Sequence, residues 1–418
     1  MKLVKMSLAA IVAAGALSSV ASATPLEEAI KNVDVSGFAR YRFDSIKKEI
    51  NSGNNNKAEA QHRFTSDVDF KAALDDNFFG VIGFRYDSED ISGDKANGQT
   101  KVGQNDNGHD NFGQTFNVRQ FLLGYKAGNT TIQAGRQVLG TFFTDDMVGT
   151  GIKILNTDIT GLTLAAVAFD DLQNDEDIGS ANGSAKNPLN GTDLTVPGSK
   201  TFNNNLYGVA AIGSYDPVSF QVWYAMLQDI TDLYAVDLAA KFDVTEDLSL
   251  GLHGQYAGSS IDSDFKAKTG NLADDADFWA IEATAEGFGV DFSVGYIDFS
   301  ADKDKVSVIS YEDAGSFIKP GEDLLDYTFF SGENKYWFVT AGYSFLEKFR
   351  VGVDYIDGTQ KIQFNKYDKS ELVARASYAY SKKLKFQTWW SHIEEDAKGT
   401  SAGDFDRDRF RFEAKYSF

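Results

Sequence analysis

Apolar and polar residues alternate along this chain, from its first tenth to its last residue. In the final stretch RFRFEAKYSF (409–418), the even positions are phenylalanine, tyrosine or alanine, and the odd positions are charged or serine. Since successive side chains of a β-strand point to opposite sides, one face of this segment is apolar and the other polar. The segments VSGFARYRFD (35–44), RFTSDVDFKAA (63–73) and FFGVIGFRYD (78–87) show the same alternation. The pattern predicts an all-β protein.

Further segments of this kind fill the rest of the chain. They cover residues 116–126, 130–138, 150–156, 162–171, 205–215, 218–228, 231–242, 248–259, 277–286, 290–299, 335–345, 349–357, 370–380, 384–394 and 406–418. Together they give about 18 strands, each close to the ~10 residues that a tilted membrane-spanning strand needs. Short turns such as 74–77 and 346–348 alternate with long polar loops, chiefly 89–115, 172–204, 260–276 and 300–334. This layout is typical of a transmembrane antiparallel β-barrel.

Aromatic residues support the barrel prediction. Many lie near strand ends on the apolar face, where rings with a polar edge suit the two membrane interfaces. The alternative is ordinary strand propensity, since aromatic residues favour β-strands in any protein. The aromatic residues concerned are Tyr41, Phe43, Tyr86, Tyr125, Tyr215, Tyr343, Phe345, Tyr378, Tyr380 and Tyr416.

The amino-terminal segment predicts export. Two lysines precede the small apolar run SLAAIVAAGALSSV (7–20), and Ala21-Ser22-Ala23 follows as an A-x-A cleavage signal. We therefore expect a signal peptide at 1–23, a short segment at 24–34 and the barrel at 35–418. A closed barrel in lipid needs a last strand that pairs with the first, and RFRFEAKYSF fits that place.

Composition excludes several function classes. The chain has no cysteine, which removes disulfides, thiolate zinc sites and thiol catalysis. It has four histidines and no nucleophile-elbow motif, so we expect no enzyme. The formal net charge of −21 disfavours nucleic-acid binding. About ten residues precede the first strand, too few for the plug of an energy-coupled transporter, which also has about 22 strands.

Several segments resemble the Campylobacter-type major outer membrane porins. The resemblance rests on the leader, TPLEEAIKNVDVSGFARYRFD (24–44), VRQFLLGYK (118–126), VGTGIKILNTDITGLTLAAVAFD (148–170), NLYGVAAIGSYD (205–216) and LYAVDLAA (233–240). It implies a trimeric barrel of about 18 strands in the Gram-negative outer membrane, in contact with lipid and lipopolysaccharide. It also implies an inward-folded third loop, a pore for small hydrophilic solutes and a calcium ion near the constriction.

Inward parity gives the candidate pore-lining residues. Charges facing a water-filled lumen stay hydrated, and mixed signs on opposing walls would tune selectivity. The simpler interpretation is that each charge only keeps the lumen wet. The candidates are Arg40, Arg42, Arg85, Lys153, Arg350, Arg375, Asp67, Asp69, Asp87 and Asp354.

Arg119 and Arg136 are further pore-lining candidates, although parity places both on the apolar face. Arg136 shares its face with Ile132, Ala134 and Val138, and a β-bulge would be needed to turn it inward.

The calcium ligands come from the resemblance. Asp145 and Asp146 fall where the family's constriction-loop ligand lies, and the second acidic ligand maps near Asp175, Glu176 and Asp177. Carboxylates are the ligands that calcium prefers, but acids in such loops are also commonly just solvated. This chain departs from the family here, with a shorter loop before VGTG.

Taken together, the sequence predicts an outer-membrane porin that passes ions and small polar solutes down their gradients. The net charge favours cations. A surface adhesin that uses the long polar loops remains the alternative function.

Overall fold

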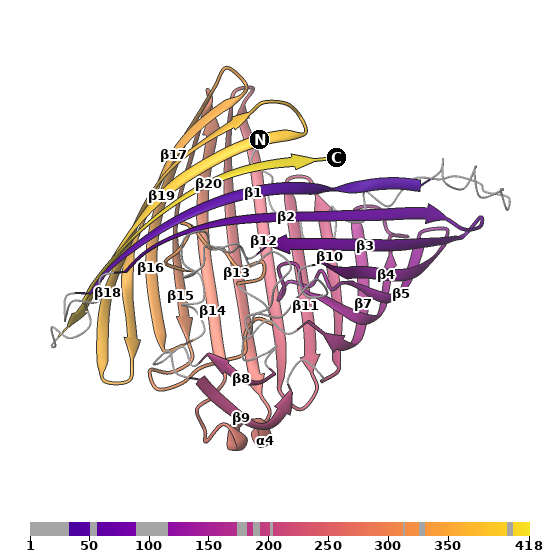
Figure 1. Ribbon diagram of the computed structural model, residues 1–418, viewed down its shortest axis with the longest axis horizontal. Coiled ribbons are helices and arrows are strands. Elements are labelled where there is room, and N and C mark those ends of the chain that lie inside the picture. The colour runs from indigo at the N-terminus through magenta and orange to yellow at the C-terminus, as the bar shows by residue number, and fades with distance from the viewer. Residues whose placement is uncertain are drawn as a thin grey trace, which may run out of the picture.

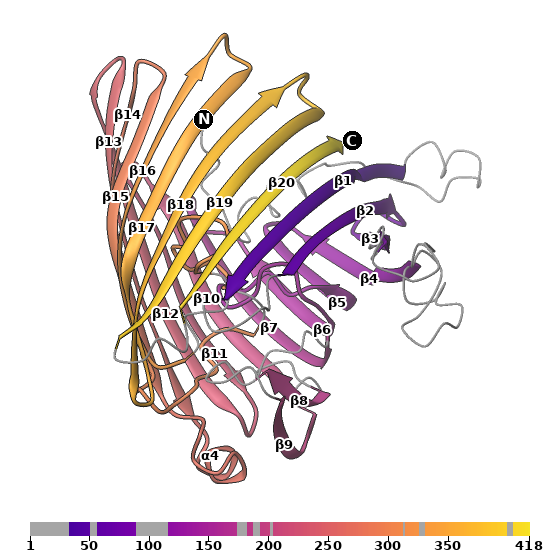
Figure 2. The same ribbon diagram turned by 60° about the vertical axis from the view of Figure 1, so that its left-hand side comes forward.

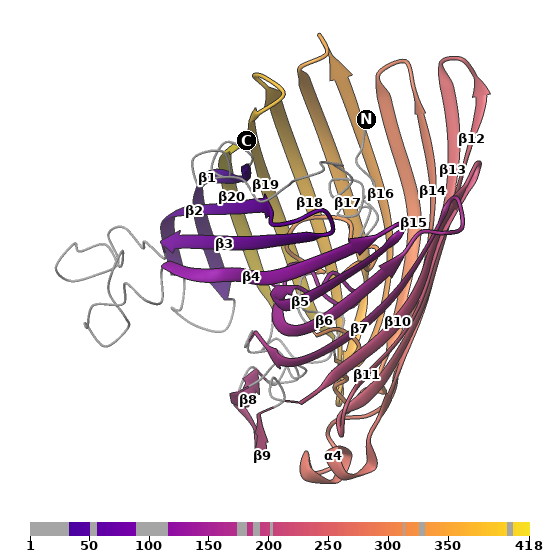
Figure 3. The same ribbon diagram turned by 90° about the vertical axis from the view of Figure 1, so that its right-hand side faces the viewer.

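The fold is a single closed sheet (Figures 1 and 3). The computed structural model describes residues 33–50, 57–88, 116–173, 182–186, 193–200, 204–311, 314–325, 331–398 and 404–418. An 18-stranded antiparallel sheet closes where β1 pairs with β20, and a separate two-stranded hairpin is formed by β8 and β9. The predicted signal peptide lies outside the described residues. No described helix is long and apolar enough to cross a membrane.

The barrel strands follow one another in chain order. They are β1 (Val33–Ile50), β2 (Lys57–Ala73), β3 (Phe78–Ser88), β4 (Phe116–Ala127), β5 (Thr130–Val138), β6 (Val148–Asn156), β7 (Leu162–Leu172), β10 (Leu206–Tyr215), β11 (Val218–Leu227), β12 (Thr231–Thr245), β13 (Leu248–Ile261), β14 (Ala276–Gly287), β15 (Val290–Ser300), β16 (Glu333–Phe345), β17 (Phe349–Ile362), β18 (Asn365–Ala379), β19 (Leu384–Lys398) and β20 (Phe405–Ser417).

Every strand expected from the alternation is present, so the barrel prediction is confirmed. Several strands continue beyond the expected range at the end that carries the long loops. The β8–β9 hairpin (Asn182–Lys186 and Asp193–Lys200) and the short helix α4 (Ser263–Lys268) lie within long loops. Both lie at the same end of the barrel, opposite the carboxyl terminus (Figure 1). Long loops and short turns are therefore segregated, as in outer-membrane barrels.

The two faces of each strand have opposite roles. In β12, Tyr234, Val236 and Leu238 point outward and are 39–51% exposed, whereas Leu233 and Ala235 point inward and are buried. Exposed apolar side chains on one parity form a hydrocarbon surface around the outside. The inner parity of the same strand is covered by loops that fold into the barrel.

Aromatic rings form a row near the short-turn end. Ring centroids lie 4.5 Å apart for Phe349 and Tyr378, and 5.4 Å apart for Phe345 and Phe349. The row continues through Phe386 and Phe412 toward Tyr41. It crosses the seam between the last and first strands, as expected for an aromatic girdle at a membrane interface.

Among the loops that the structure describes, two enter the barrel. The third loop (residues 139–147, between β5 and β6) folds inward as the resemblance implied, and its Phe142 and Phe143 are fully buried. The described parts of the seventh loop (residues 301–311, 314–325 and 331–332, between β15 and β16) also fold inward, which the sequence interpretation missed. Figure 2 shows the connecting segments running within the curve of the strands.

The third and seventh loops pack on each other. The backbone N–H of Tyr311 donates to the carbonyl of Phe143 at 2.9 Å, and that of Ser316 donates to Phe142 at 2.8 Å. The ring of Phe317 lies 5.1 Å from that of Phe142 and 4.4 Å from that of Phe278 in the wall. We call this unit the plug. It fills one side of the lumen with an apolar core that continues into β6, β7 and β10–β16.

Gly315 is required where the two loops touch. Its φ is +50°, and a Cβ there would lie 2.6 Å from the carbonyl oxygen of Phe142. An alanine would therefore meet both backbone strain and a backbone clash.

We predict that Gly315→Ala loosens the plug while the barrel still folds, because the wall is hydrogen-bonded independently of the loop. The left-handed strain alone costs about 1–2 kcal/mol. Single-channel recordings should show more frequent conductance fluctuations. Gly270→Ala is the matched control, since Gly270 has φ +66° with nothing near its Cβ position. Equally frequent conductance fluctuations in both variants would contradict a role for the contact between Gly315 and Phe142.

Candidate functional site: the charged wall of the lumen

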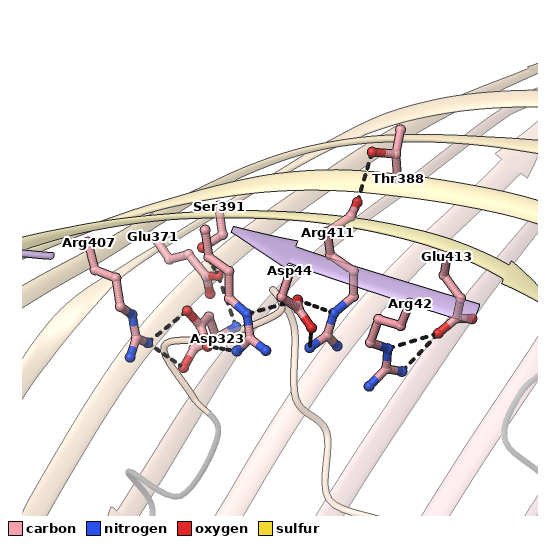
Figure 4. A network of polar contacts seen from close by, with 10 residues as sticks. Arg42, Asp44, Asp323, Glu371, Thr388, Ser391, Arg407, Arg411 and Glu413 are labelled. Atoms are coloured by element: carbon pink, nitrogen blue, oxygen red, sulfur yellow. Dashed lines mark hydrogen bonds and ion pairs between the residues drawn. The ribbon is translucent and has the colours of Figure 1, made fainter. Parts of the chain in front are cut away.

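Charged side chains cover the inner face of β1–β4 and β17–β20, the side of the lumen that the plug leaves uncovered. Arg42 donates to the Glu413 carboxylate through Nε at 3.2 Å and Nη2 at 2.8 Å. Arg411 holds Asp44 in a two-pronged pair, with distances of 2.6 and 3.0 Å. The sheet closes where β1 pairs with β20. These ion pairs therefore also join the first and last strands of the barrel, on the side that faces the lumen (Figure 4).

The seventh loop is tied to this wall through Asp323. The Asp323 carboxylate accepts from Arg409 at 3.0 Å and pairs with Arg407 at 2.9 Å. Arg409 also lies 3.3 Å from Asp44, so one carboxylate from the loop and one from β1 share a guanidinium. Figure 4 shows Arg407, Asp323, Asp44 and Arg411 in one continuous network.

Glu371 is the second attachment of this loop. It is fully buried on β18, and its carboxylate accepts the backbone N–H groups of Glu322, Asp323 and Leu324 at 3.0–3.2 Å. The Ser391 hydroxyl donates to it at 2.6 Å. A buried carboxylate is stable only when such donors replace water. Glu371 thus fixes the tip of the seventh loop.

Arg375 and Arg350 lie on the same wall. Arg375 donates to Glu322 of the seventh loop at 2.5 Å and also contacts Asp354 on β17. Arg350 makes a two-pronged pair with Asp291 on β15, at 2.6 and 2.9 Å. Burial raises the pKa of Glu322, against the opposing effect of the nearby Arg375.

A second cluster joins the third loop to β2–β4. Arg85 donates to both oxygens of Asp67, at 2.7 and 2.8 Å, and to Asp146 at 2.7 Å. Arg119 donates to the backbone carbonyl of Asp146 at 2.6 Å and lies 3.0 Å from its carboxylate. We call these four residues the arginine–aspartate quartet.

Arg119 reaches this cluster through a β-bulge. The register between β3 and β4 shifts at Gly83 and Phe84, which pair with Gln120 and Val118 and leave Arg119 between them. A bulge turns a side chain toward the other face. Arg119 is buried inside, whereas its neighbours Val118 and Phe121 are exposed outside.

Two predicted pore-lining residues lie elsewhere. Arg136 stays on the outer face, where it lies 3.6 Å from Asp171, because no bulge interrupts β5 at this point. Lys153 faces inward but is buried beneath the third loop, and its ammonium donates to the Val138 carbonyl at 2.6 Å. It supports the base of the loop and does not face open water.

Of the other residues predicted to line the pore or bind calcium, some lie on the inner wall and others fall outside the described structure. Arg40 is on the inner wall, 3.9 Å from Glu413. Asp69 accepts from Gln120 at 2.9 Å. The side chain of Asp87 and the residues Asp175 and Asp177 lie outside the described part of the structure, so their predicted roles stay predictions.

The surroundings of Asp146 do not fit a calcium ion. Calcium takes six to eight oxygen ligands, whereas the Asp146 carboxylate and carbonyl face two guanidinium groups. Asp145 is exposed beside it. Among the described residues, no group of three or more histidine, aspartate or glutamate side chains could hold a metal.

Sequence reasoning missed several members of the wall. Arg409, Arg411 and Glu413 lie on the charged face of the last predicted strand, so parity alone could have selected them. Glu322 and Asp323 carried no such signal, because their partners are strands that follow the loop by about 50–85 residues.

The wall and plug together define the site: a narrowed, charged lumen in a closed barrel with an apolar outside. The sequence model of the Campylobacter major outer membrane protein matches residues 1–418. The chain belongs to that family. It is a multi-pass protein of the outer membrane, and family and fold point to a channel rather than an enzyme.

Solved outer-membrane proteins share the fold. A BenF-like porin from Pseudomonas fluorescens Pf-5 is 15% identical with a TM-score of 0.65, covering 92% of this chain and 99% of that one. OpdK from Pseudomonas aeruginosa, solved with vanillate, is 15% identical with a TM-score of 0.62 and coverage of 92% and 99%. OccAB4 from Acinetobacter baumannii is 14% identical with a TM-score of 0.63, covering 92% and 98%. No curated protein matches the sequence.

We predict a pH response that depends on Glu322. Because burial raises its pKa, lowering the pH protonates Glu322 before ordinary surface glutamates. The lumen then loses one negative charge, and the reversal potential in a salt gradient should move toward anions. Glu322→Gln should already show the low-pH reversal potential at neutral pH and should shift less than the wild type when the pH is lowered.

The matched control is Glu333→Gln, which removes the carboxylate of a pair with Lys361 at the long-loop ends of β16 and β17, on the outward-facing parity of both strands. It should keep the wild-type pH response. A Glu322→Gln channel that titrates like the wild type would show that another group is responsible.

Proposed function

We propose that this outer-membrane protein is a porin for the passive diffusion of ions and small hydrophilic solutes. One observation carries the proposal: the inner wall beside the plug is lined by charged, hydrogen-bonding side chains, whereas the outer face is apolar. A barrel interior with this chemistry holds water and offers hydrated solutes a path.

The lining carries both signs of charge at close quarters. Guanidinium groups come from β1, β17, β18 and β20, while carboxylates come from the same strands and from the seventh loop. Such an arrangement lets solutes exchange hydration water for side-chain contacts without deep trapping, because each charge already has a partner. This supports a diffusion channel rather than a high-affinity binding protein.

Cation preference is the second part of the proposal. Aspartate and glutamate outnumber lysine and arginine in each long loop, 89–115, 172–204, 260–276 and 300–334. An acidic mouth raises the local concentration of cations. The arginines of the wall act in the opposite direction, so the reversal potential reports which charges dominate at the narrowest point.

A homotrimer is the third part. The ion pair of Arg136 and Asp171 lies on the outer face next to Phe121, which is 66% exposed. A charged residue facing lipid destabilises a barrel by an amount that grows toward the bilayer centre. Contact with another subunit would shield this patch, which supports the trimer that the resemblance implied.

The test is single-channel conductance of refolded protein in a planar bilayer under a potassium chloride gradient. We expect stable conductance steps that occur in threes and a reversal potential that favours potassium. A reversal potential that favours chloride would refute cation preference and leave the porin standing. Silent bilayers with correctly folded barrels would refute the porin itself.

A further inference from the structure

We propose that Arg85 and Arg119 take the place of a divalent cation at the third loop. The two arginines then hold this loop at the constriction of the porin without calcium. The inference rests on the proposed porin function and concerns how the third loop is held. It is drawn from the arginine–aspartate quartet alone, and it departs from what the family resemblance implied.

Two guanidinium groups connect the third loop to the wall. Nη2 of Arg85 donates to Asp67 Oδ2 at 2.8 Å and to Asp146 Oδ2 at 2.7 Å, so one guanidinium bridges a carboxylate of the wall and a carboxylate of the loop. Nη2 of Arg119 lies 3.0 Å from the same Asp146 oxygen, and its Nε lies 3.7 Å from Asp67 Oδ2. Both cations therefore stand between the same two acids, as a bridging metal would.

The charges of the quartet balance one another. Two guanidinium groups carry the same charge as one divalent cation, and two carboxylates balance it. Guanidinium is planar and always protonated, and it matches carboxylate oxygens in pairs. The side chains of Arg119 and Asp67 are only 8% and 13% exposed, which strengthens their attraction compared with water.

A β-bulge and a separate hydrogen bond determine which side chains join the quartet. The β-bulge in β4 turns Arg119 into the lumen, where strict alternation would have pointed it outward. Asp69, two residues from Asp67, is held separately by Gln120 and does not enter the bridge. The wall thus supplies one acid and two cations, while the loop supplies Asp146 and its carbonyl.

The consequence is a third loop whose attachment does not depend on free calcium. Ion pairs with arginine persist across the physiological pH range, since arginine does not deprotonate. Calcium sites of extracellular modules, in contrast, have dissociation constants of about 10⁻⁴–10⁻³ M and empty when the metal is scarce. In this porin, the metal would have to displace two guanidinium groups to bind Asp146.

The experiment compares wild-type channels with the Arg85→Gln/Arg119→Gln double variant, titrated with calcium chloride and then treated with a chelator. Wild-type conductance and noise should not respond to either. The double variant removes both guanidinium groups of the quartet from Asp67 and Asp146, and it should gain a calcium response with a midpoint of about 10⁻⁴–10⁻³ M. Adding Asp146→Asn to the double variant should abolish the gained response.

Two controls sharpen the result. Arg85→Lys/Arg119→Lys keeps both charges and should remain insensitive to calcium. Arg350→Gln breaks a two-pronged pair with Asp291 that does not touch the third loop, so it should change conductance without a calcium response.

Two outcomes overturn the proposal. One is a wild-type channel that responds to chelation and loses that response in Asp146→Asn, because calcium would then hold the loop. The other is a folded Arg85→Gln/Arg119→Gln variant that does not respond to calcium and whose conductance fluctuates no more than that of the wild type. If the double variant does not fold, the wild-type chelation experiment still decides. Loss of all wild-type conductance would instead reject the porin function.

Discussion

The structure depends on the pairing of β1 with β20. Lipid offers no hydrogen bonds, so a membrane sheet must close on itself. Here the backbone N–H and carbonyl of Gly37 pair with those of Phe418 at 3.1 Å, and the ladder continues to Ile50 and Phe405. The terminal phenylalanine therefore belongs to the seam. Ion pairs between Arg42 and Glu413 and between Asp44 and Arg411 reinforce the same seam from inside.

Closure creates a lumen, and the loops decide how much of it remains open. The plug covers the apolar inner face of β10–β16, which would otherwise face water. The opposite wall remains charged, and the seventh loop is held against it through Glu322, Asp323 and the amides that Glu371 binds. The pore is thus off-centre, with apolar packing on one side and paired charges on the other.

The sequence was sufficient to predict the strands of the barrel and most of their inward-facing residues. It was not sufficient to predict the loops that fill the lumen. Alternation has a period of two, so it marks every strand and assigns Arg42, Arg350 and Arg375 to the inner face. A bulge breaks that period without a local signal, which is why Arg119 and Arg136 could not be told apart. Arg119 crosses to the inside at a bulge, whereas Arg136 stays outside with Asp171.

Loops posed a different difficulty. The seventh loop contains Val306, Val308, Ile309, Tyr311, Phe317 and Ile318, and this apolar content was a readable sign that the loop is buried. Its partners were not readable, since Phe142 and Glu371 lie far away in the chain. Asp146 resembles a calcium ligand by position, but only the fold brings Arg85 and Arg119 to it.

In the proposed porin, solutes pass between the plug and the charged wall. A cysteine-free chain allows a direct test. Ser377, on β18 beside Arg350 and Gln387, lines a cavity of about 130 Å³ on this path, and Ala374 on the same strand faces outward. A bulky water-soluble thiol reagent added to single open channels should lower the conductance of Ser377→Cys stepwise and leave that of Ala374→Cys unchanged. An unaltered current through modified Ser377→Cys channels would contradict this account.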